Sequence, residues 1–236
     1  MPKNAHTIVR NGLLSLCAGK QAGKEETVMP KGSEELTNAR KEEIINACAL
    51  LYETMGFKDI TIRDIGARTS FTRTSIYNYF QTKEEIFLAL LQREYEAWIE
   101  DVERIREQNG PLPPEEFADK LAHTLEKRGC MLRLISMNLY DMEANSRLEN
   151  LAAFKQVYGH ALGAVTGCLE KFFPSMTEED KEGFLCAFFP FLFGVYPYTS
   201  HTDKQKAAME LAHVNYTERS VYELTKPFIT KILSSL

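Results

Sequence analysis

From Thr37 to the C-terminus, apolar residues recur at helical spacing almost without interruption. The first such stretch places Ile44, Cys48, Leu51 and Met55 on one helical face. No run alternates apolar and polar residues between hairpin turns, and no segment repeats another. The pattern therefore predicts an all-α protein.

Breakers and caps divide this pattern into helices. Gly56 is expected to end the first helix in a left-handed conformation, and Thr61 with Asp64 to open the second with a capping box. Thr72 should cap a third helix ending near Phe80, and Thr82–Glu85 forms another capping box. The longer helices are expected at residues 38–55, 82–107, 114–128, 130–142, 147–173, 178–196, 203–213 and 217–235, the last one capped by Thr217.

The charge distribution bears on the kind of partner. The net charge of −5 argues at first against nucleic acid. However, residues 37–83 carry 7 Lys/Arg and 5 Asp/Glu, whereas residues 84–236 carry 16 and 24. A mildly basic segment joined to an acidic body fits a protein that contacts DNA through one end.

Composition also suggests domains and a compartment. We expect a mobile extension at residues 1–36, a DNA-binding domain at 37–83 and a second helical domain at 84–236. The five cysteines are odd in number and form no CxxC pair, so we expect reduced thiols. The longest apolar run, 185–196, is shorter than the roughly 20 residues of a membrane helix. These features favour a soluble, cytoplasmic protein without a membrane partner.

Three consecutive helices with a tight turn before the third are typical of a helix-turn-helix, whose third helix enters the major groove. That third segment is TRTSIYNYF, residues 72–80. With Ile76 and Phe80 directed inward, its outward residues are one cation and several hydrogen-bonding side chains. No acid occurs from Gly66 to Gln81, as a surface that meets phosphates and base edges requires.

The segment KDITIRDIGARTSFTRTSIYNYFQTKEEIF, residues 58–87, resembles the DNA-binding domain of the tetracycline-repressor (TetR) family. The residues that carry the likeness are Thr61, Ile65, Thr72, Ile76, Tyr77, Tyr79, Phe80, Lys83 and Ile86. Four positions depart from the family pattern. Gly66 replaces Ala, Phe71 replaces a smaller aliphatic residue, Thr74 replaces a frequent Gly, and Ser70 is the fourth. Ser70 stands where the turn favours Gly, so we expect positive φ and about 1 kcal/mol of strain there.

The resemblance implies roles for ten residues at a DNA interface. Tyr77 and Lys83 would contact phosphates, while Thr61 and Arg63 would hold the adjacent strand. Base edges would be contacted by four residues of the third helix behind the Thr72 cap, namely Arg73, Thr74, Ser75 and Asn78. Two roles are possible for Tyr79, which are contact with DNA and packing in the core.

For residues 84–236 the resemblance implies a ligand-binding and dimerisation domain, with helices 178–196 and 217–235 forming an intersubunit four-helix bundle. Candidate ligand contacts are Trp98, Met137, Tyr158, Phe188 and Phe189, for which plain core packing is the alternative. Gly159, Gly163 and Gly167 at four-residue spacing indicate either a close helix crossing, which we favour, or space for a ligand. The histidines share no i, i+4 pair, so no metal site is expected.

The expected function is therefore a homodimeric repressor that a small-molecule effector releases from a palindromic double-stranded DNA operator. The alternatives are a transcriptional activator and a DNA-bound adaptor without a ligand. The sequence contains no GxSxG, GxGxxG, P-loop or HExxH motif, so we expect neither an enzyme nor a cofactor.

Overall fold

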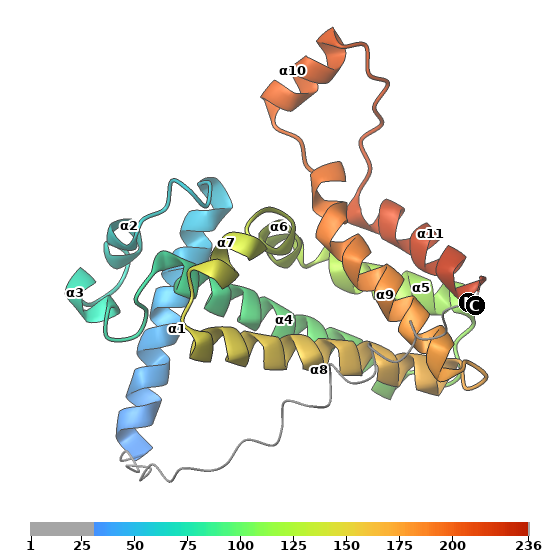
Figure 1. Cartoon of the computed structure of the whole chain (residues 1–236), viewed down its shortest axis with the longest axis horizontal. Coiled ribbons are helices and arrows are strands. Elements are labelled where there is room, and N and C mark those ends of the chain that lie inside the picture. Colours follow the sequence, from blue (N-terminus) through green and yellow to red (C-terminus); the bar gives the residue numbers. More distant parts are fainter. Residues whose placement is uncertain (1–30, 236) are drawn as a thin grey trace, which may run out of the picture. The chain divides into compact units, whose positions relative to one another are not determined.

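The computed structural model describes residues 31–235, and over this range the chain is helical without any strand (Figure 1). The all-α prediction is confirmed. The chain divides after Ala39, and the elements that carry the site lie in the unit Arg40–Leu236.

The helices follow one another with short connections. Their bounds are α1 Lys31–Thr54, α2 Ile62–Gly66, α3 Arg73–Ile76, α4 Lys83–Gln108, α5 Pro114–Glu126, α6 Gly129–Met137, α7 Leu139–Ala144, α8 Leu148–Phe172, α9 Glu178–Val195, the 3₁₀ helix η1 Tyr196–Tyr198, α10 Asp203–Leu211 and α11 Val221–Leu233.

Several helix boundaries differ from the predictions, including those at α1, at α6 with α7, and at α11. Helix α1 already begins at Lys31, so residues 31–36 of the expected extension are helical, whereas residues 1–30 lie outside the described range. The expected helix 130–142 is two helices that meet at Asn138, whose amide oxygen accepts a hydrogen bond from the Tyr52 hydroxyl at 3.1 Å. The last helix is capped by Ser220 in a capping box with Glu223 and not by Thr217.

The end of α1 is held by a residue distant in sequence. The expectation of a left-handed Gly56 is wrong, because no described glycine has positive φ. A Cβ at Gly56 would instead lie 2.7 Å from the Asp59 carboxylate. The last carbonyls of α1 are bound by Arg133 of α6, which donates to Tyr52 O at 2.7 Å and Met55 O at 3.2 Å. A cation at a helix C-terminus also opposes the helix dipole.

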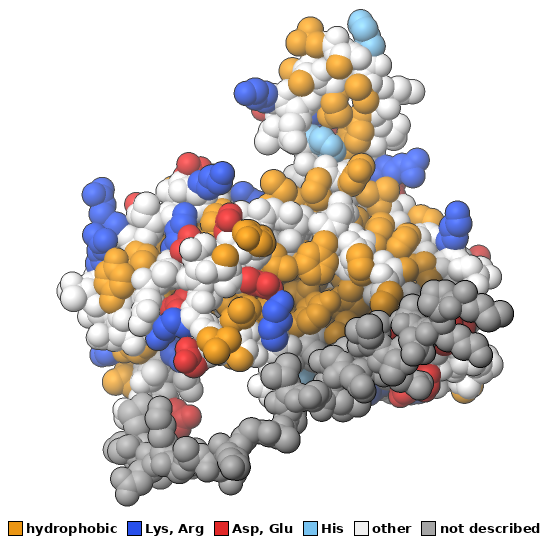
Figure 2. All heavy atoms as spheres, viewed as in Figure 1, with side chains coloured by type: hydrophobic (Ala, Val, Ile, Leu, Met, Phe, Trp, Pro, Cys, Tyr) orange, Lys and Arg blue, Asp and Glu red, His pale blue; other side chains and the backbone are white. Residues whose placement is uncertain are grey.

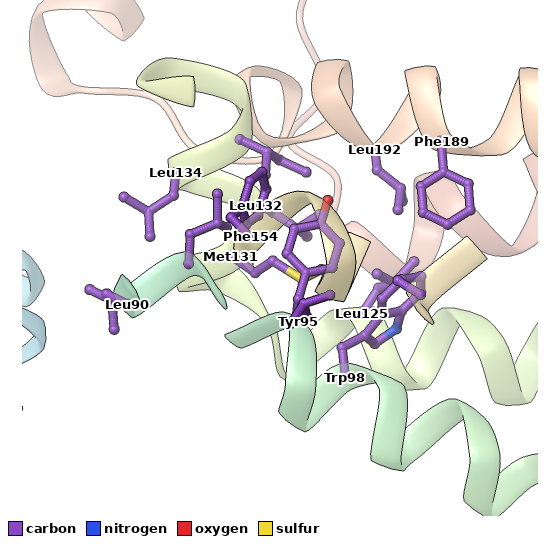
Figure 3. Packing of buried hydrophobic residues seen from close by; sticks show 14 of the residues in the cluster. Leu90, Tyr95, Trp98, Leu125, Met131, Leu132, Leu134, Phe154, Phe189 and Leu192 are labelled. Atoms are coloured by element: carbon purple, nitrogen blue, oxygen red, sulfur yellow. The ribbon is translucent and has the colours of Figure 1, made fainter. Parts of the chain in front are cut away.

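Helix α4 packs against α1 near its start and against the helices of the body farther along. Near its start Ile86 and Phe87 are buried with the residues of α1, and Phe87 packs edge-on against Tyr52 at 5.2 Å between ring centroids. Farther along, Tyr95 and Trp98 rise from α4 toward side chains of α6, α8 and α9 (Figure 3). Helices α4 and α8 form the most extensive helix pair of the fold, so α4 connects the DNA-binding segment to the body.

The glycine pattern of α8 gives a mixed result. A Cβ at Gly167 would meet the Arg106 side chain of α4, which is flexible, and no backbone atom of α4 is among its nearest neighbours. Nothing lies within 4 Å of a Cβ placed at Gly159 or Gly163, and both residues are exposed. Gly167 therefore faces α4, as a crossing requires, but none of the three glycines is needed for a close approach of two backbones.

Helix α9 is rich in apolar residues from Phe184 to its end. In the described range, no single helix has the length and apolar character to span a membrane. One pair, Glu178–Tyr198 with Asp203–Leu211, meets that criterion by length and composition only and is bent by 82°.

The segment that follows α3 is fixed by a buried carboxylate, that of Glu85. The Glu85 side chain has no solvent exposure and accepts hydrogen bonds from Gln81 N at 2.7 Å, Arg147 Nε at 2.6 Å and Arg147 Nη2 at 2.9 Å. Arg147 precedes α8 and also donates to Tyr79 O at 3.2 Å. Glu85 therefore closes only half of the predicted capping box, because its backbone N–H binds Thr82 Oγ while its carboxylate binds Gln81 and Arg147.

The Glu85→Gln variant should unfold more easily. Burial opposes ionisation, but the hydrogen bonds from Arg147 and Gln81 outweigh it and lower the pKa of Glu85. We expect a loss of roughly 2–3 kcal/mol in the free energy of unfolding at pH 7. The loss stays below the range for fully buried pairs because the Arg147 side chain is 41% exposed. Chemical denaturation of the variant and the wild type measures this difference.

The same pair predicts a pH dependence. Because the folded pKa is lowered, the stabilisation is complete above the unfolded value near 4.5 and is lost as pH falls through the folded pKa. The wild-type advantage should shrink below that pH. The matched control is Glu84→Gln, one residue earlier in the same helix turn, which should change stability by less than about 1 kcal/mol. Equal losses in both variants would show that the buried pair adds nothing.

Candidate nucleic-acid interface

The third helix of the predicted helix-turn-helix presents the expected side chains. Ile76 and Phe80 are buried, which confirms their inward assignment. Helix α3 is shorter than predicted, but Phe80 N still donates to Ile76 O at 3.0 Å, so the turn continues to Phe80. Of the predicted contacts here, Ser75 and Tyr79 are half-buried, and the exposed ones are Thr72, Arg73, Thr74, Tyr77 and Asn78.

The turn between α2 and α3 is held from α1. Ser70 N and Ser70 Oγ both donate to the Glu43 carboxylate, the second at 3.0 Å. Ser70 does not have positive φ, since His213 is the one described non-glycine residue that does. The expected backbone strain at Ser70 is therefore absent, and a side-chain anchor takes the place of a glycine turn.

Gly66 permits a close approach of α2 to α3. A Cβ at this position would lie 3.4 Å from both Arg73 Cα and Ile76 Cδ1. A methyl group fits this space only at contact distance, and a larger side chain would displace Arg73. The spacing therefore accommodates the family's alanine as well, and the glycine at this position has no structural explanation.

Arg73 and Tyr77 form an ordered pair on the exposed surface. Arg73 Nη2 donates to the Tyr77 hydroxyl at 3.2 Å, and its guanidinium lies 5.9 Å from the ring centroid. Tyr77 is 44% exposed. The pair presents a cation and an aromatic hydroxyl together, which suits contact with a phosphate and a neighbouring base edge.

Tyr79 has a structural partner that the sequence did not suggest. Its hydroxyl accepts a hydrogen bond from Arg40 Nη1 of α1 at 3.2 Å, and its ring packs on Phe71 at 6.5 Å between centroids. Arg40 and Glu43 thus support the third helix from α1. Neither was predicted, because these contacts join residues 39 and 27 positions apart without any local motif.

Three other predicted contact residues are engaged within the chain. Lys83 Nζ donates to Phe57 O at 2.7 Å and Ile60 O at 3.2 Å. Thr61 forms the predicted capping box, in which Thr61 N donates to the Asp64 carboxylate at 3.0 Å. Thr72 occupies the cap position without a side-chain cap bond, because its hydroxyl lies 3.1 Å from that of Ser75. Arg63 is exposed.

Four of the five candidate ligand contacts lie together in the body. Trp98 contacts the rings of Phe188 at 6.4 Å and Phe189 at 6.1 Å, and Tyr158 meets Phe189 at 5.6 Å. Met137, which is 58% exposed, lines a different surface hollow of about 340 Å³.

The sequence missed the residue at the centre of this aromatic cluster, Tyr95. Its ring meets Trp98 at 6.2 Å, Phe154 at 5.9 Å and Tyr158 at 6.0 Å (Figure 3). Burial raises the pKa of Tyr95, and its buried hydroxyl has no hydrogen-bond partner among the described residues. The Trp98 indole N–H is already satisfied by Thr124 Oγ at 2.9 Å. Tyr95 therefore supplies an unused polar group inside the cluster.

The described cysteines have no disulfide partner. Cys48 and Cys168 are buried, and burial raises the pKa of Cys168 to about 12. Such thiols stay protonated and unreactive near neutral pH. Cys186 of α9 is exposed.

Two family models match the chain. The model for bacterial regulatory proteins of the tetR family matches residues 44–90. The model for the tetracyclin repressor-like C-terminal domain matches residues 92–230. The boundary between the two falls inside α4.

Curated relatives share the N-terminal part. The chain is 30% identical over 63 residues to the uncharacterised HTH-type regulator YfiR of Bacillus subtilis, which is 27% of this chain and 31% of the relative. It is 25% identical over 75 residues to the HTH-type regulator RutR of Escherichia coli K12, covering 32% and 35% of the two chains. The chain thus spans about a third of the length of these relatives.

Solved structures share the whole fold at low identity. A TetR-family regulator from Mesorhizobium loti has a TM-score of 0.57 at 14% identity, over 84% of this chain and 97% of the other. FadR from Bacillus subtilis, determined with stearoyl-CoA, has a TM-score of 0.55 at 15% identity, over 83% and 98%. The two family models together cover nearly all of residues 44–230, so the chain belongs to the TetR family of DNA-binding transcriptional regulators, which are not enzymes.

Proposed function

We propose that this regulator is a homodimeric repressor that binds a near-palindromic operator through its third helix and is released by a small-molecule effector. The observation that carries the proposal is the exposed surface of α3 and the following turn. Arg73, Thr74, Tyr77 and Asn78 are exposed there, and no carboxylate occurs between Gly66 and Gln81. Such a surface offers donors to phosphates and base edges without repelling them.

Two residues of this surface should affect DNA binding in different ways. The DNA for these measurements is the duplex sequence that the full-length protein selects in vitro from a random pool. Asn78→Ala removes a base contact and should cost about 1–3 kcal/mol at one base position while relaxing specificity there. Tyr77→Ala removes a phosphate contact and should weaken binding to all sequences alike. Titration of matched and single-mismatch duplexes measures both effects.

The control is Tyr140→Ala, which removes an 84% exposed tyrosine of α7 outside the helix-turn-helix and should leave DNA affinity unchanged. A Tyr77→Ala protein with altered base preference and full affinity would show that the role of Tyr77 is wrongly assigned.

The surface of α9 supports the proposal of a homodimer. Its sequence from Gly183 through the next segment to Thr202 contains no Asp, Glu, Lys or Arg. Hydrophobic side chains gather over this part of the surface (Figure 2). The exposed positions of its outer face are Gly183, Cys186, Pro190 and Gly194. A helix face with small, uncharged residues packs closely against another helix, and exposed apolar surface of this kind marks an interaction site.

A charge on that face should separate the protomers. Gly194→Glu adds a carboxylate where nothing lies within 4 Å, so the fold is kept while each dimer would bury two like charges. We expect a monomer at about 10 µM, a concentration at which a wild-type dimer stays associated. Light scattering after size exclusion measures the mass. Gly110→Glu, also in open space but in the α4–α5 connection, should remain dimeric.

A dimeric Gly194→Glu protein would place the interface elsewhere. Loss of the dimer in both variants would point to a general effect of added negative charge.

The proposed effector site is the aromatic cluster around Tyr95. The solved FadR neighbour holds stearoyl-CoA, which supports small-molecule binding as a property of this fold. In the present chain the cluster contains one buried polar group without a partner, the Tyr95 hydroxyl. A bound effector would satisfy that group, and its entry would move α8 or α9 against α4.

Tyr95→Phe should test this site in the absence of any ligand. Removing a buried hydroxyl without a partner should raise the free energy of unfolding by about 1 kcal/mol. The control, Tyr52→Phe, removes a hydroxyl that donates to Asn138 and should lower it by a similar amount. Calorimetry measures both. A destabilised Tyr95→Phe protein would mean that the hydroxyl has a partner in the free protein, which leaves no unused group for an effector.

A further inference from the structure

A second pocket lies apart from the aromatic cluster and from the DNA-facing surface. Its volume is about 330 Å³, and it lies where α1 meets α4, α6 and η1. The lining residues that matter here are Tyr52, Glu53, Glu94, Cys130, Arg133 and Tyr196. A volume of this size is at the lower end for small-molecule sites, so it suits a compact ligand.

Its two carboxylates are unpaired. Neither Glu53 nor Glu94 forms a hydrogen bond or ion pair with any described residue. The neighbouring Arg93 of α4 is committed to α1, where it donates to Glu42 at 3.2 Å and Asn46 at 2.6 Å. The carboxylates therefore remain available to a partner from solution.

The one cation in the lining is already committed. Arg133 stacks on the Tyr52 ring at 4.0 Å and donates to Tyr52 O and Met55 O. The half-buried Cys130 is neutral, because burial and the nearby Glu94 raise its pKa to about 12. Two carboxylates and one guanidinium leave the pocket with a net charge of −1, and two of the five N–H donors of the guanidinium are bound to backbone carbonyls.

The walls between these charges are aromatic and aliphatic. Tyr52 and Tyr196 supply rings, and Ala49 adds a small apolar surface. Aromatic faces and carboxylates together bind ammonium groups through cation–π and ion-pair contacts. Two carboxylates alone do not provide the six or more oxygens of a calcium site.

We propose that this junction pocket binds a small monovalent organic cation, an amine with an aromatic or apolar body, between Glu53, Glu94 and the tyrosine rings. The ligand would contact α1 of the DNA-binding segment and α6 of the body at once. Because Arg133 fastens the end of α1 beside the pocket, a ligand that fits the present geometry stabilises this arrangement of the two helices.

Three compounds of one shape and different charge test the class of ligand. Phenethylamine is a cation, 2-phenylethanol is its neutral analogue and phenylacetate is an anion. Titration calorimetry on the full-length protein should show binding of the amine about tenfold tighter than that of the alcohol, and no binding of phenylacetate. Equal affinity for amine and alcohol, or no binding of the amine, overturns the proposal.

The carboxylates are tested by substitution. The double variant Glu53→Gln and Glu94→Gln should remove the preference for the amine, whereas Glu100→Gln, an exposed acid on the same α4, should retain it. Circular dichroism checks that each variant is folded. A preference that survives in the double variant contradicts the assignment.

Filling the pocket gives an independent readout. Cys130→Phe places a ring in the pocket and should weaken the binding of phenethylamine at least tenfold in the same titration. Met137→Phe, at a 58% exposed position of the same helix α6, is the matched control and should leave the affinity unchanged. An amine that binds the folded Cys130→Phe variant with full affinity occupies another place, which refutes this site while leaving the proposed DNA-binding function intact.

Discussion

The buried carboxylate of Glu85 is the interaction on which the position of the DNA-facing helix depends. It lies in the first turn of α4 and binds the backbone of Gln81 just after the third helix, together with Arg147 at the start of α8. Arg147 in turn binds Tyr79 O. A change at the start of α8 therefore reaches the end of the recognition segment through three side-chain contacts. Because these hydrogen bonds are directional and charge-assisted, they are either formed or broken, which suits a two-state regulator.

A second attachment fixes the other side of the DNA-binding segment. Arg133 of α6 binds the terminal carbonyls of α1, and α1 holds the α2–α3 turn through Glu43. Both attachments use an arginine of the body and backbone carbonyls of the DNA-binding segment. Helix α4 is thus accompanied by other connections between the two parts, and a ligand near either arginine has a route to the recognition helix. Helix α8 begins at one attachment and α6 contains the other, so movement in the body need not pass along α4.

Local sequence rules predicted what depends on neighbours within a turn or two. The inward positions Ile76 and Phe80 and the capping box at Thr61 follow from spacing and hydrogen-bonding chemistry. Two of the errors occur where a distant residue competes. Glu85 leaves its capping box for Arg147, and Asn138, which ends α6, accepts from Tyr52. Such partners lie more than 60 positions apart and have no periodic signature. The outward positions of the third helix follow from its own helical spacing. Their supports Arg40 and Glu43 lie on α1, and local spacing does not reveal such partners.

The net charge of the DNA-binding segment differs from the charge that its third helix presents to solvent. The excess of two positive charges over residues 37–83 does not describe the surface around the third helix, because three of the five acids of the segment accept hydrogen bonds within the chain. Glu43 accepts from Ser70, and Asp64 accepts from the side chain and backbone of Thr61, which lower its pKa. Glu42 is paired with Arg93 at 3.2 Å. Each of these carboxylates organises the helix-turn-helix from within while Arg73 stays exposed. An acidic protein can therefore present a DNA-compatible surface without a large basic patch, provided that its nearby acids already have donors.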